Sequence, residues 1–469
     1  MTRFQKVSLL AALYLAQGLP YGFFTQALPV LLRTSKMSLP AIGLSHLLTI
    51  PWALKFVWAP AADRRQIKGM GLRRSWLLPI QLATCLLYLS MSAISLEADL
   101  SWILVAFLIG NLLAATQDIA TDGLAVDLTT HEERGWVNSI QVAGYRIGMI
   151  LGGGALLALF PSIGWSGVMI AIAVLCLACT VPVLRYREPL ERKLRPEVRG
   201  IRETLMEVLH FLRRPGALLW AAVLLTYKLG HASATAMMKP WLVDVGYSPE
   251  QIAGILGSAG LVAGFLGAVT GGLLAAKFER RRLLIALTVL QALAVSSYLW
   301  PLMTERDTMK VLVATGFDHF TSGLATVTLF TLMMDACSKE RAAADYTMQA
   351  CLVVVSQISA GAISLILAEK FGYSQQFAVA ALAGLGGLCL TTFALTRDRS
   401  LEFFQPTLKA ASIAIIFAVT ATGVAHAQTP EGAPVGPANS YLFHLHGDTF
   451  LPSRISGATE IVPGWGAGV

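Results

Sequence analysis

The sequence predicts an all-α membrane protein with twelve spanning helices in two six-helix halves. The chain of 469 residues is 55% hydrophobic and only 14% charged. Its apolar stretches repeatedly reach the roughly 20 residues that a helix needs to cross a bilayer. A helix also pairs its own backbone polar groups, which the bilayer core requires. Finally, the charged segments that follow the stretches in the first half have counterparts in the second half.

Twelve apolar stretches follow one another along the chain. We expect helices over residues 7–32, 41–62, 75–96, 102–126, 136–160, 165–184, 217–243, 251–276, 283–303, 309–334, 346–368 and 374–396. We therefore expect residues 1–184 to form the N-terminal half and residues 217–396 the C-terminal half.

The charged segments support this division. Asp127, Glu133 and Arg134 follow the fourth stretch, and Asp335 with the pair 340–341 follows the tenth. Repeated six-helix halves place a solute site at their interface near the middle of the membrane. Basic residues also follow the second stretch (Arg64, Arg65, Lys68, Arg73, Arg74) and the eighth (Arg280, Arg281, Arg282).

The distribution of positive charge predicts the orientation. Most of the 36 Lys and Arg residues lie in segments on the same side as the N-terminus. The positive-inside rule then predicts a cytoplasmic N-terminus. This asymmetry and contact with anionic lipid explain the net charge of +8, so the composition does not favour a nucleic-acid partner.

Two segments lie outside the repeated pattern. Residues 185–216 carry nine basic side chains among glutamates, with apolar residues at helical spacing. This pattern predicts a cytoplasmic amphipathic connector on the membrane surface, or alternatively a regulatory docking site. Residues 397–469 contain a signal-peptide-like apolar segment (409–427) and a Gly- and Pro-rich tail, irregular or with a short β-strand. The tail is interpreted as a fused fragment of an exported protein, or as a thirteenth span with a periplasmic end.

The histidines and cysteines give weak signals for metal or disulfide chemistry. His444 and His446 are one residue apart, a spacing that suits a metal but is more often incidental. The six cysteines lie mostly inside expected helices, so they are interpreted as small buried fillers and not as a disulfide framework.

Four charged residues interrupt the apolar stretches and indicate the chemistry. Asp118 and Asp122 are one helical turn apart, and Arg146 and Lys228 lie in later stretches. Charges in a bilayer are costly and usually face a partner or a watery cavity. Two neighbouring carboxylates cannot both ionise cheaply, so one is expected to hold a proton. The alternative is that the acids pair with Arg146 or Lys55 and lock the bundle.

Other polar residues are expected to line the same cavity. His231 shares a helix face with Lys228, and Asp318 with His319 lies in the tenth stretch, which should face the centre as the fourth does. The uncharged members of the set are Gln17, Tyr21, Gln26, Gln117 and Tyr145. We expect no cofactor or metal, and the sequence contains no H-E-x-x-H, G-x-S-x-G or Walker A motif. The glycine stripes 144/148/152 and 260/264 are interpreted as helix packing, with flexing as an alternative.

Several motifs together resemble the AmpG branch of the major facilitator superfamily. They are Lys55–Arg64 followed by Leu72-Arg73-Arg74-Ser-Trp, then Gln117–Asp122, Glu132–Gly135, Gly144–Gly148 and Tyr227–Gly230. The resemblance covers about residues 5–396. It implies a monomeric, proton-driven importer of the bacterial inner membrane, with anhydromuropeptide as the cargo.

The resemblance also implies roles for individual residues. Asp118, Asp122, Arg146 and Lys228 would line the coupling and substrate cavity. Asp63 with Arg64, Arg73 and Arg74 would form a cytoplasmic latch between the second and third helices, extended by Asp127, Glu133 and Arg134. Such a charge network suits a two-state rocking mechanism.

The sequence departs from the AmpG pattern at a few positions. His231 stands where the branch usually has an acid, and residues 122–126 and 326–335 are closer to single-permease siderophore importers. Acetyl-CoA carriers are more distant relatives. A siderophore is therefore the alternative cargo. A membrane sensor or scaffold without transport is the alternative function, although the charges in both cavity and latch favour an importer.

Overall fold

The computed structural model describes residues 1–28, 31, 48, 50–94, 100–189, 206, 210–303 and 306–397. Every regular element within these ranges is helical. Most of the expected connector (190–205 and 207–209), the segment 409–427, the remaining tail, and His444 with His446 lie outside the described residues. The expectations for those segments therefore stay predictions.

The first helices form the N-terminal group, defined as the helices of residues 3–185. Their order is α1 (Arg3–Gly22), the π-turn η1 (Phe23–Ala27), α4 (Ile50–Leu54), η3 (Lys55–Val57), α5 (Ala59–Ala62), α6 (Arg74–Met91), α7 (Leu100–Leu128), α8 (Arg134–Met149), η4 (Ile150–Ala155) and α9 (Leu156–Arg185). Thr2 and Gln5 form a capping box that starts α1. Gly164, at a φ of 63°, separates the expected fifth and sixth spans within α9.

The later helices form the C-terminal group, defined as those of residues 217–397. Their order is α11 (Ala217–Thr226), α12 (Leu229–Asp244), α13 (Pro249–Ile252), η6 (Ala253–Ala259), α14 (Gly260–Lys277), α15 (Arg280–Ser297), α16 (Leu299–Leu302), α17 (Thr308–Asp335), α18 (Ala342–Phe371) and α19 (Tyr373–Arg397). The expected span 217–243 is broken at Tyr227 and Lys228, so it consists of two helices.

Seven of the described helical segments are long and apolar enough to cross a membrane. One of them, Arg134–Arg185, contains two of the expected spans, and the expected spans 41–62, 75–96, 217–243 and 309–334 are not among the seven. The count of twelve is therefore only partly confirmed. Large apolar side chains point outward from the described helices, including Leu86 (67% exposed), Trp102 (68%) and Leu218 (70%), as lipid-facing residues do.

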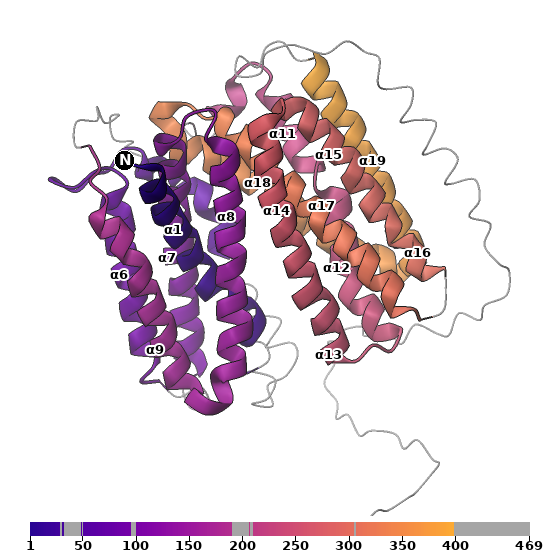
Figure 1. The fold of residues 1–469 in the computed structure, drawn as a ribbon, viewed down its shortest axis with the longest axis horizontal. Helices are drawn as coiled ribbons and strands as arrows, with labels where there is room; N and C mark the ends of the chain where they lie inside the picture. The colour runs from indigo at the N-terminus through magenta and orange to yellow at the C-terminus, as the bar shows by residue number, and fades with distance from the viewer. Residues whose placement is uncertain are drawn as a thin grey trace, which may run out of the picture. The chain divides into compact units, whose positions relative to one another are not determined.

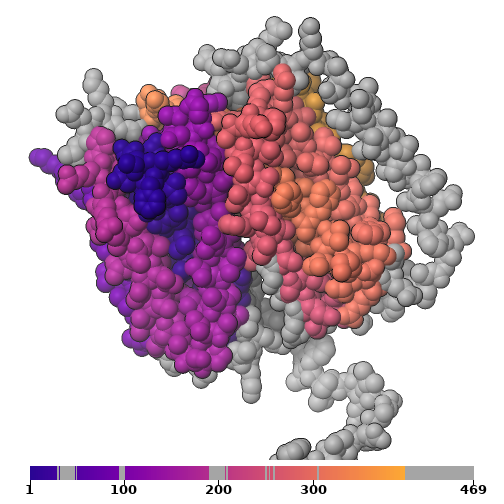
Figure 2. All heavy atoms as spheres, in the orientation of Figure 1, coloured from indigo at the N-terminus to yellow at the C-terminus, as the bar shows by residue number. Residues whose placement is uncertain are grey.

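The two groups meet along α8 and α14, which run side by side in Figure 1. In Figure 2 their atoms touch along the upper part of the boundary between the violet and salmon regions. On the other side of the interface, α18 packs against α7 and against the short helices α4 and α5. The helices that carry Asp118, Asp122 and Arg146 therefore all lie at this interface.

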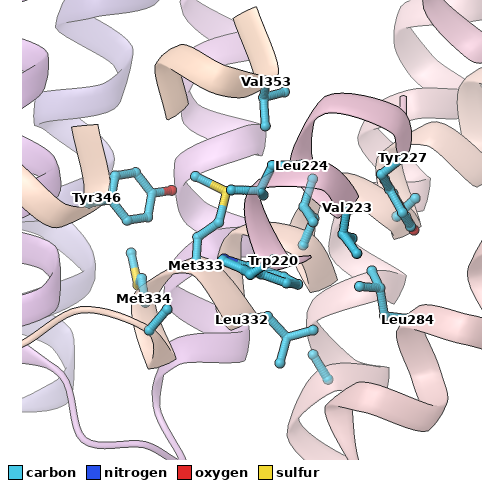
Figure 3. Packing of buried hydrophobic residues seen from close by; sticks show 14 of the residues in the cluster. Trp220, Val223, Leu224, Tyr227, Leu284, Leu332, Met333, Met334, Tyr346 and Val353 are labelled. Carbon is cyan, nitrogen blue, oxygen red and sulfur yellow. The ribbon is translucent and has the colours of Figure 1, made fainter. Parts of the chain in front are cut away.

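The C-terminal group has a core centred on Trp220. Figure 3 shows its indole among Met333, Leu332 and Val223. The indole Nε1 donates to Gln349 Oε1 over 2.7 Å, so the buried ring has its polar atom satisfied. This packing joins α11, α17 and α18 and holds α18 against the interface.

Candidate functional site

Lys55 and Asp118 form a buried ion pair in the N-terminal group. Lys55 lies in the single turn η3 between α4 and α5 and is 3% exposed. Its ammonium donates to Asp118 Oδ2 and lies 5.4 Å from the centre of the Trp52 ring. This is one of the two pairings expected for a locking role, and it neutralises one of the two acids.

Asp122 has a different environment, one helical turn further along α7. Its carboxylate Oδ1 accepts from Tyr14 Oη over 3.0 Å and from Gln141 Nε2 over 3.1 Å. Tyr346 Oη donates to Gln141 Oε1 over 3.4 Å, which extends the chain of hydrogen bonds to α18. In the part of the chain that the structure describes, Asp122 has no ion-pair partner. The two acids are therefore chemically distinct.

Asp318 is the buried acid of the C-terminal group. It is fully buried on α17, lies 2.9 Å from His231 Nδ1, and accepts from Tyr298 Oη over 3.1 Å. The other ring nitrogen of His231 lies 3.0 Å from Ser322 Oγ. The structure thus brings His231 and Asp318 together, as the sequence predicts for one cavity.

Lys228 lies at the break between α11 and α12 and is 5% exposed. Its ammonium donates to two hydroxyls of α17, Ser322 Oγ at 3.5 Å and Thr326 Oγ1. Within the described ranges no carboxylate lies within ion-pair distance of it. Neither residue 227 nor residue 228 is Gly or Pro, so the usual helix breakers do not explain the break. The break coincides instead with the hydrogen bonds from Lys228 to α17.

Arg146 reaches from α8 across the interface to α14. Its guanidinium lies on Gly264, where a Cβ would collide with Nη1. His319 of α17 lies in the same way against Gly260, one turn earlier. Interpreting the 260/264 stripe as helix packing was therefore incomplete, since its lack of side chains makes room for two basic residues. The stripe 144/148/152 does pack as expected, against the backbone of α1.

The uncharged residues lie around these groups. The Tyr21 ring lies 5.7 Å from that of Tyr145 and 5.6 Å from that of Trp52. Gln117 Nε2 donates to a backbone carbonyl of α1 over 3.4 Å. Gln17 is 2% exposed, and both polar atoms of its amide lack a hydrogen-bond partner in the described structure. Gln17 therefore has the capacity to bind a polar solute.

Asp63 connects the two groups at the end of the bundle where the N-terminus lies, here called the charged end (Figure 1). Its carboxylate accepts from the backbone amides of Ala343 (3.1 Å) and Ala344 (2.9 Å), at the start of α18. Arg73, which is fully buried, donates to Asp63 and to Asp127, both over 2.8 Å. Asp63 therefore ties the start of α18 to Arg73 of the N-terminal group.

A second bridge at the charged end uses Arg134 and Asp335. Arg134 Nη1 donates to Asp335 Oδ1 over 2.7 Å, and Arg280 Nη1 donates to both oxygens of the same carboxylate. Arg280 also donates to the backbone carbonyl of His131. Arg134, an expected latch residue, therefore bridges the two groups, and its partner Asp335 was not foreseen.

The remaining latch residues have local partners. Glu133 pairs with Lys6 over 2.6 Å, so it joins α1 to α8 within one group, and this hydrogen bond holds the pKa of the carboxyl below its usual value. Arg64 is buried, and Arg74 donates to the carbonyl of Leu184 over 3.4 Å. Their part in a latch between the two groups stays a prediction.

The sequence reasoning missed several residues of the site. Glu188 accepts from the backbone amides of Arg73 and Arg74 over 2.9–3.0 Å and so holds the start of α6. Its position in a charge-rich segment gave no signal for this contact. Tyr14, Gln141, Tyr346, Ser322 and Thr326 were missed as well, because a neutral polar residue in a helix has no distinctive pattern in a single sequence.

Comparisons with known proteins identify relatives of this chain. Residues 10–352 match the family model described as Major Facilitator Superfamily. The chain is 27% identical to the anhydromuropeptide permease of Escherichia coli K12 over 425 residues, which cover 89% of this chain and 86% of that protein. It is 25% identical to a putative transporter, AmpG 4, of Rickettsia felis, over 71% of this chain and 83% of that protein.

Solved structures share the fold. A bacterial homologue of the iron transporter ferroportin in an outward-facing state superposes with a TM-score of 0.63 at 17% identity, over 84% of this chain and 99% of that chain. The proton:xylose symporter XylE superposes with a TM-score of 0.65 at 11% identity, over 86% of this chain and all of that chain. At these identities the likeness is one of fold alone.

Proposed function

We propose that this chain, which belongs to the Major Facilitator Superfamily, imports a polar solute such as anhydromuropeptide by proton-coupled alternating access. It is a multi-pass membrane transporter related to the AmpG permeases, and the resemblance predicted from its motifs is confirmed. The cargo, the coupling ion and the cytoplasmic position of the N-terminus belong to the proposal.

The proposed coupling role rests on the different environments of Asp118 and Asp122. Asp118 faces the Lys55 ammonium, whereas Asp122 has only neutral donors, Tyr14 and Gln141. Two carboxylates one turn apart in a medium of low dielectric constant cannot both be charged cheaply. The acid without a cation is the one that holds the proton. A proton that binds and leaves Asp122 couples the gradient to transport.

The bridges at the charged end support alternating access. Asp63 with α18, Arg134 with Asp335, and Gln141 with Tyr346 all join the two groups between that end and the level of Asp122. Each bridge consists of hydrogen bonds that must break together for this end to open. We infer from these bridges that the structure corresponds to the state closed toward the cytoplasm.

The test is uptake by inner-membrane vesicles that lack other importers. Radiolabelled GlcNAc-anhydroMurNAc-peptide and a labelled ferric siderophore are each offered with and without an imposed proton gradient. We expect gradient-dependent uptake of the muropeptide and none of the siderophore. Uptake of the siderophore alone would replace the proposed cargo. Absence of both would favour a sensor, and uptake that ignores the gradient would overturn the coupling.

A further inference from the structure

The charges buried between the two helix groups do not balance. Lys55 is paired with Asp118, and Asp318 is paired with His231. Asp122 is satisfied by neutral donors. Two cations remain, Arg146 and Lys228, and among the described residues neither has a carboxylate within ion-pair distance.

Arg146 is held in place but not neutralised. Its guanidinium rests on the backbone of α14 at Gly264, and its Nη1 is buried without a hydrogen-bond partner in the described structure. A guanidinium is planar and presents two parallel N–H donors, a geometry that matches a carboxylate. The contact with Gly264 thus fixes the orientation of the Arg146 guanidinium while leaving donors without an acceptor.

In the described structure, the ammonium of Lys228 is hydrogen-bonded to hydroxyl groups alone. Ser322 and Thr326 accept from its ammonium, but they supply no negative charge. Asp318 is already engaged by His231. Ser322 is next in sequence to Gly323, which packs against the backbone oxygen of Gly264, the residue on which Arg146 lies. Lys228 is buried and Arg146 is partly buried, so the two cations lie at neighbouring positions of α14 and α17, and a buried charge without a counter-ion is costly.

An anion between the two cations would remove this cost. We propose that Arg146 and Lys228 form an anion subsite that receives a carboxylate of the cargo. This inference rests on the proposed function, because it places the subsite in the transport cavity. Arg146 comes from the N-terminal group and Lys228 from the C-terminal group, so a bound carboxylate contacts both groups and contributes to the affinity of one facing state.

The first experiment compares two forms of one sugar. Vesicles with an imposed proton gradient are offered GlcNAc-anhydroMurNAc, which has a free lactyl carboxylate, or its primary amide. We expect the wild type to prefer the acid by about tenfold or more, because hydrogen bonds to charged groups are the strong ones. In Arg146→Gln and in Lys228→Gln the preference should fall toward one. Arg146→Lys keeps the positive charge but loses the planar pair of N–H donors, so this variant should retain part of the preference for the acid.

Lys239→Gln is the matched control. Lys239 lies on the same helix as His231, is exposed, and has no hydrogen bond or ion pair with the described residues. We expect this variant to keep the wild-type preference. Equal uptake of acid and amide by the wild type would overturn the subsite and leave the proposed importer standing.

A second experiment does not depend on the cargo. Tyr21→Cys places a thiol beside Tyr145, next in sequence to Arg146. Its reaction rates with the anionic sulfonatoethyl and the cationic trimethylammonioethyl methanethiosulfonates are compared in the purified full chain, after subtraction of the native cysteines. We expect the anionic reagent to be favoured, and Arg146→Gln to reduce the ratio several-fold. A ratio that neither Arg146→Gln nor Lys228→Gln changes would overturn the proposal even if both sugars failed to enter.

Discussion

Arg134 donates to Asp335 over 2.7 Å, which ties the first residue of α8 to the last residue of α17. The two residues belong to different helix groups and are 201 positions apart in the sequence. Arg280 donates to the same carboxylate. One buried carboxylate therefore accepts from two guanidinium groups, and opening this end of the bundle must break its hydrogen bond with Arg134.

Asp335→Asn should favour the state that is open to the cytoplasm. The change removes the charge from hydrogen bonds worth about 1.5–3 kcal/mol each when one partner is ionised. A loss of that size shifts a two-state population roughly tenfold or more. The measurement is the distance between spin labels on the charged ends of α8 and α17, which should lengthen in a larger fraction of molecules.

Glu279→Gln serves as the control for Asp335→Asn. Glu279 pairs with Arg282 over 2.7 Å at the start of α15, and both side chains are largely exposed. Exposed pairs contribute little, so the label distances should not change. Equal effects of the two substitutions would show that net charge, and not the bridge, controls the state.

Asp63→Ala should slow turnover. The change removes the acceptor from the amides of Ala343 and Ala344 and leaves the Arg73 guanidinium, among the described residues, with Asp127 as its acid. The closed state then loses its cap at the start of α18, and caps are worth about 1 kcal/mol. Initial uptake rates with a saturating proton gradient provide the measurement. Glu340→Ala, an exposed acid just before α18, should leave the rate unchanged.

Replacing both members of the Lys55 and Asp118 pair separates locking from coupling. Removing one partner of a buried ion pair costs about 3–5 kcal/mol, whereas an apolar pair of similar volume is often neutral. We expect Lys55→Met alone to lower the thermal stability and Asp118→Leu added to it to restore the stability. Gradient-driven uptake should stay lost in the double variant. If uptake also returned, the pair would only hold the bundle together.

The resemblance grouped Asp63 with Arg73 in the latch, and the sequence offered Lys55 and Arg146 as alternative partners for the two acids of α7. The structure pairs Arg73 with Asp63 and Lys55 with Asp118. The sequence could not predict which acid of α7 receives Lys55, because that choice depends on how the short helix η3 packs against α7. It likewise gave no partner for Arg134, since contacts across 201 residues follow from helix packing and not from local pattern.

The glycines illustrate the same limit. The spacing of Gly260 and Gly264 indicated close helix contact, and Gly267 and Gly271 do pack against the backbone of α17. Gly264 also packs against Gly323 of α17, and in addition Arg146 lies on it, while His319 lies against Gly260. A Cβ would collide with a helix backbone at Gly267 and with a guanidinium at Gly264, so a sequence alone cannot tell a helix contact from the contact of a long side chain.

Asp122→Asn should abolish uptake driven by the proton gradient while the protein still inserts. Asparagine keeps an oxygen that accepts from Tyr14 and Gln141, so the local hydrogen bonds survive. It cannot take up a proton, and so exchange of labelled for unlabelled cargo should continue without a gradient. Asp307→Asn is the control, since Asp307 caps α17 and asparagine caps equally well. Normal concentrative uptake by Asp122→Asn would remove this acid from the coupling step.

Gly264→Ala should impair transport more than the addition of a single methyl group suggests. A methyl group at this position collides with the guanidinium of Arg146, which must then move out of its seat. Gly316→Ala, on α17, meets nothing within 4 Å, and in an open helical position alanine is favoured over glycine by about 1 kcal/mol. We therefore expect Gly316→Ala to raise thermal stability slightly and leave uptake intact. Gly264→Ala should lower uptake at least as much as Arg146→Lys does. If the two glycine variants behaved alike in uptake assays, the contact with Gly264 would have no part in positioning Arg146.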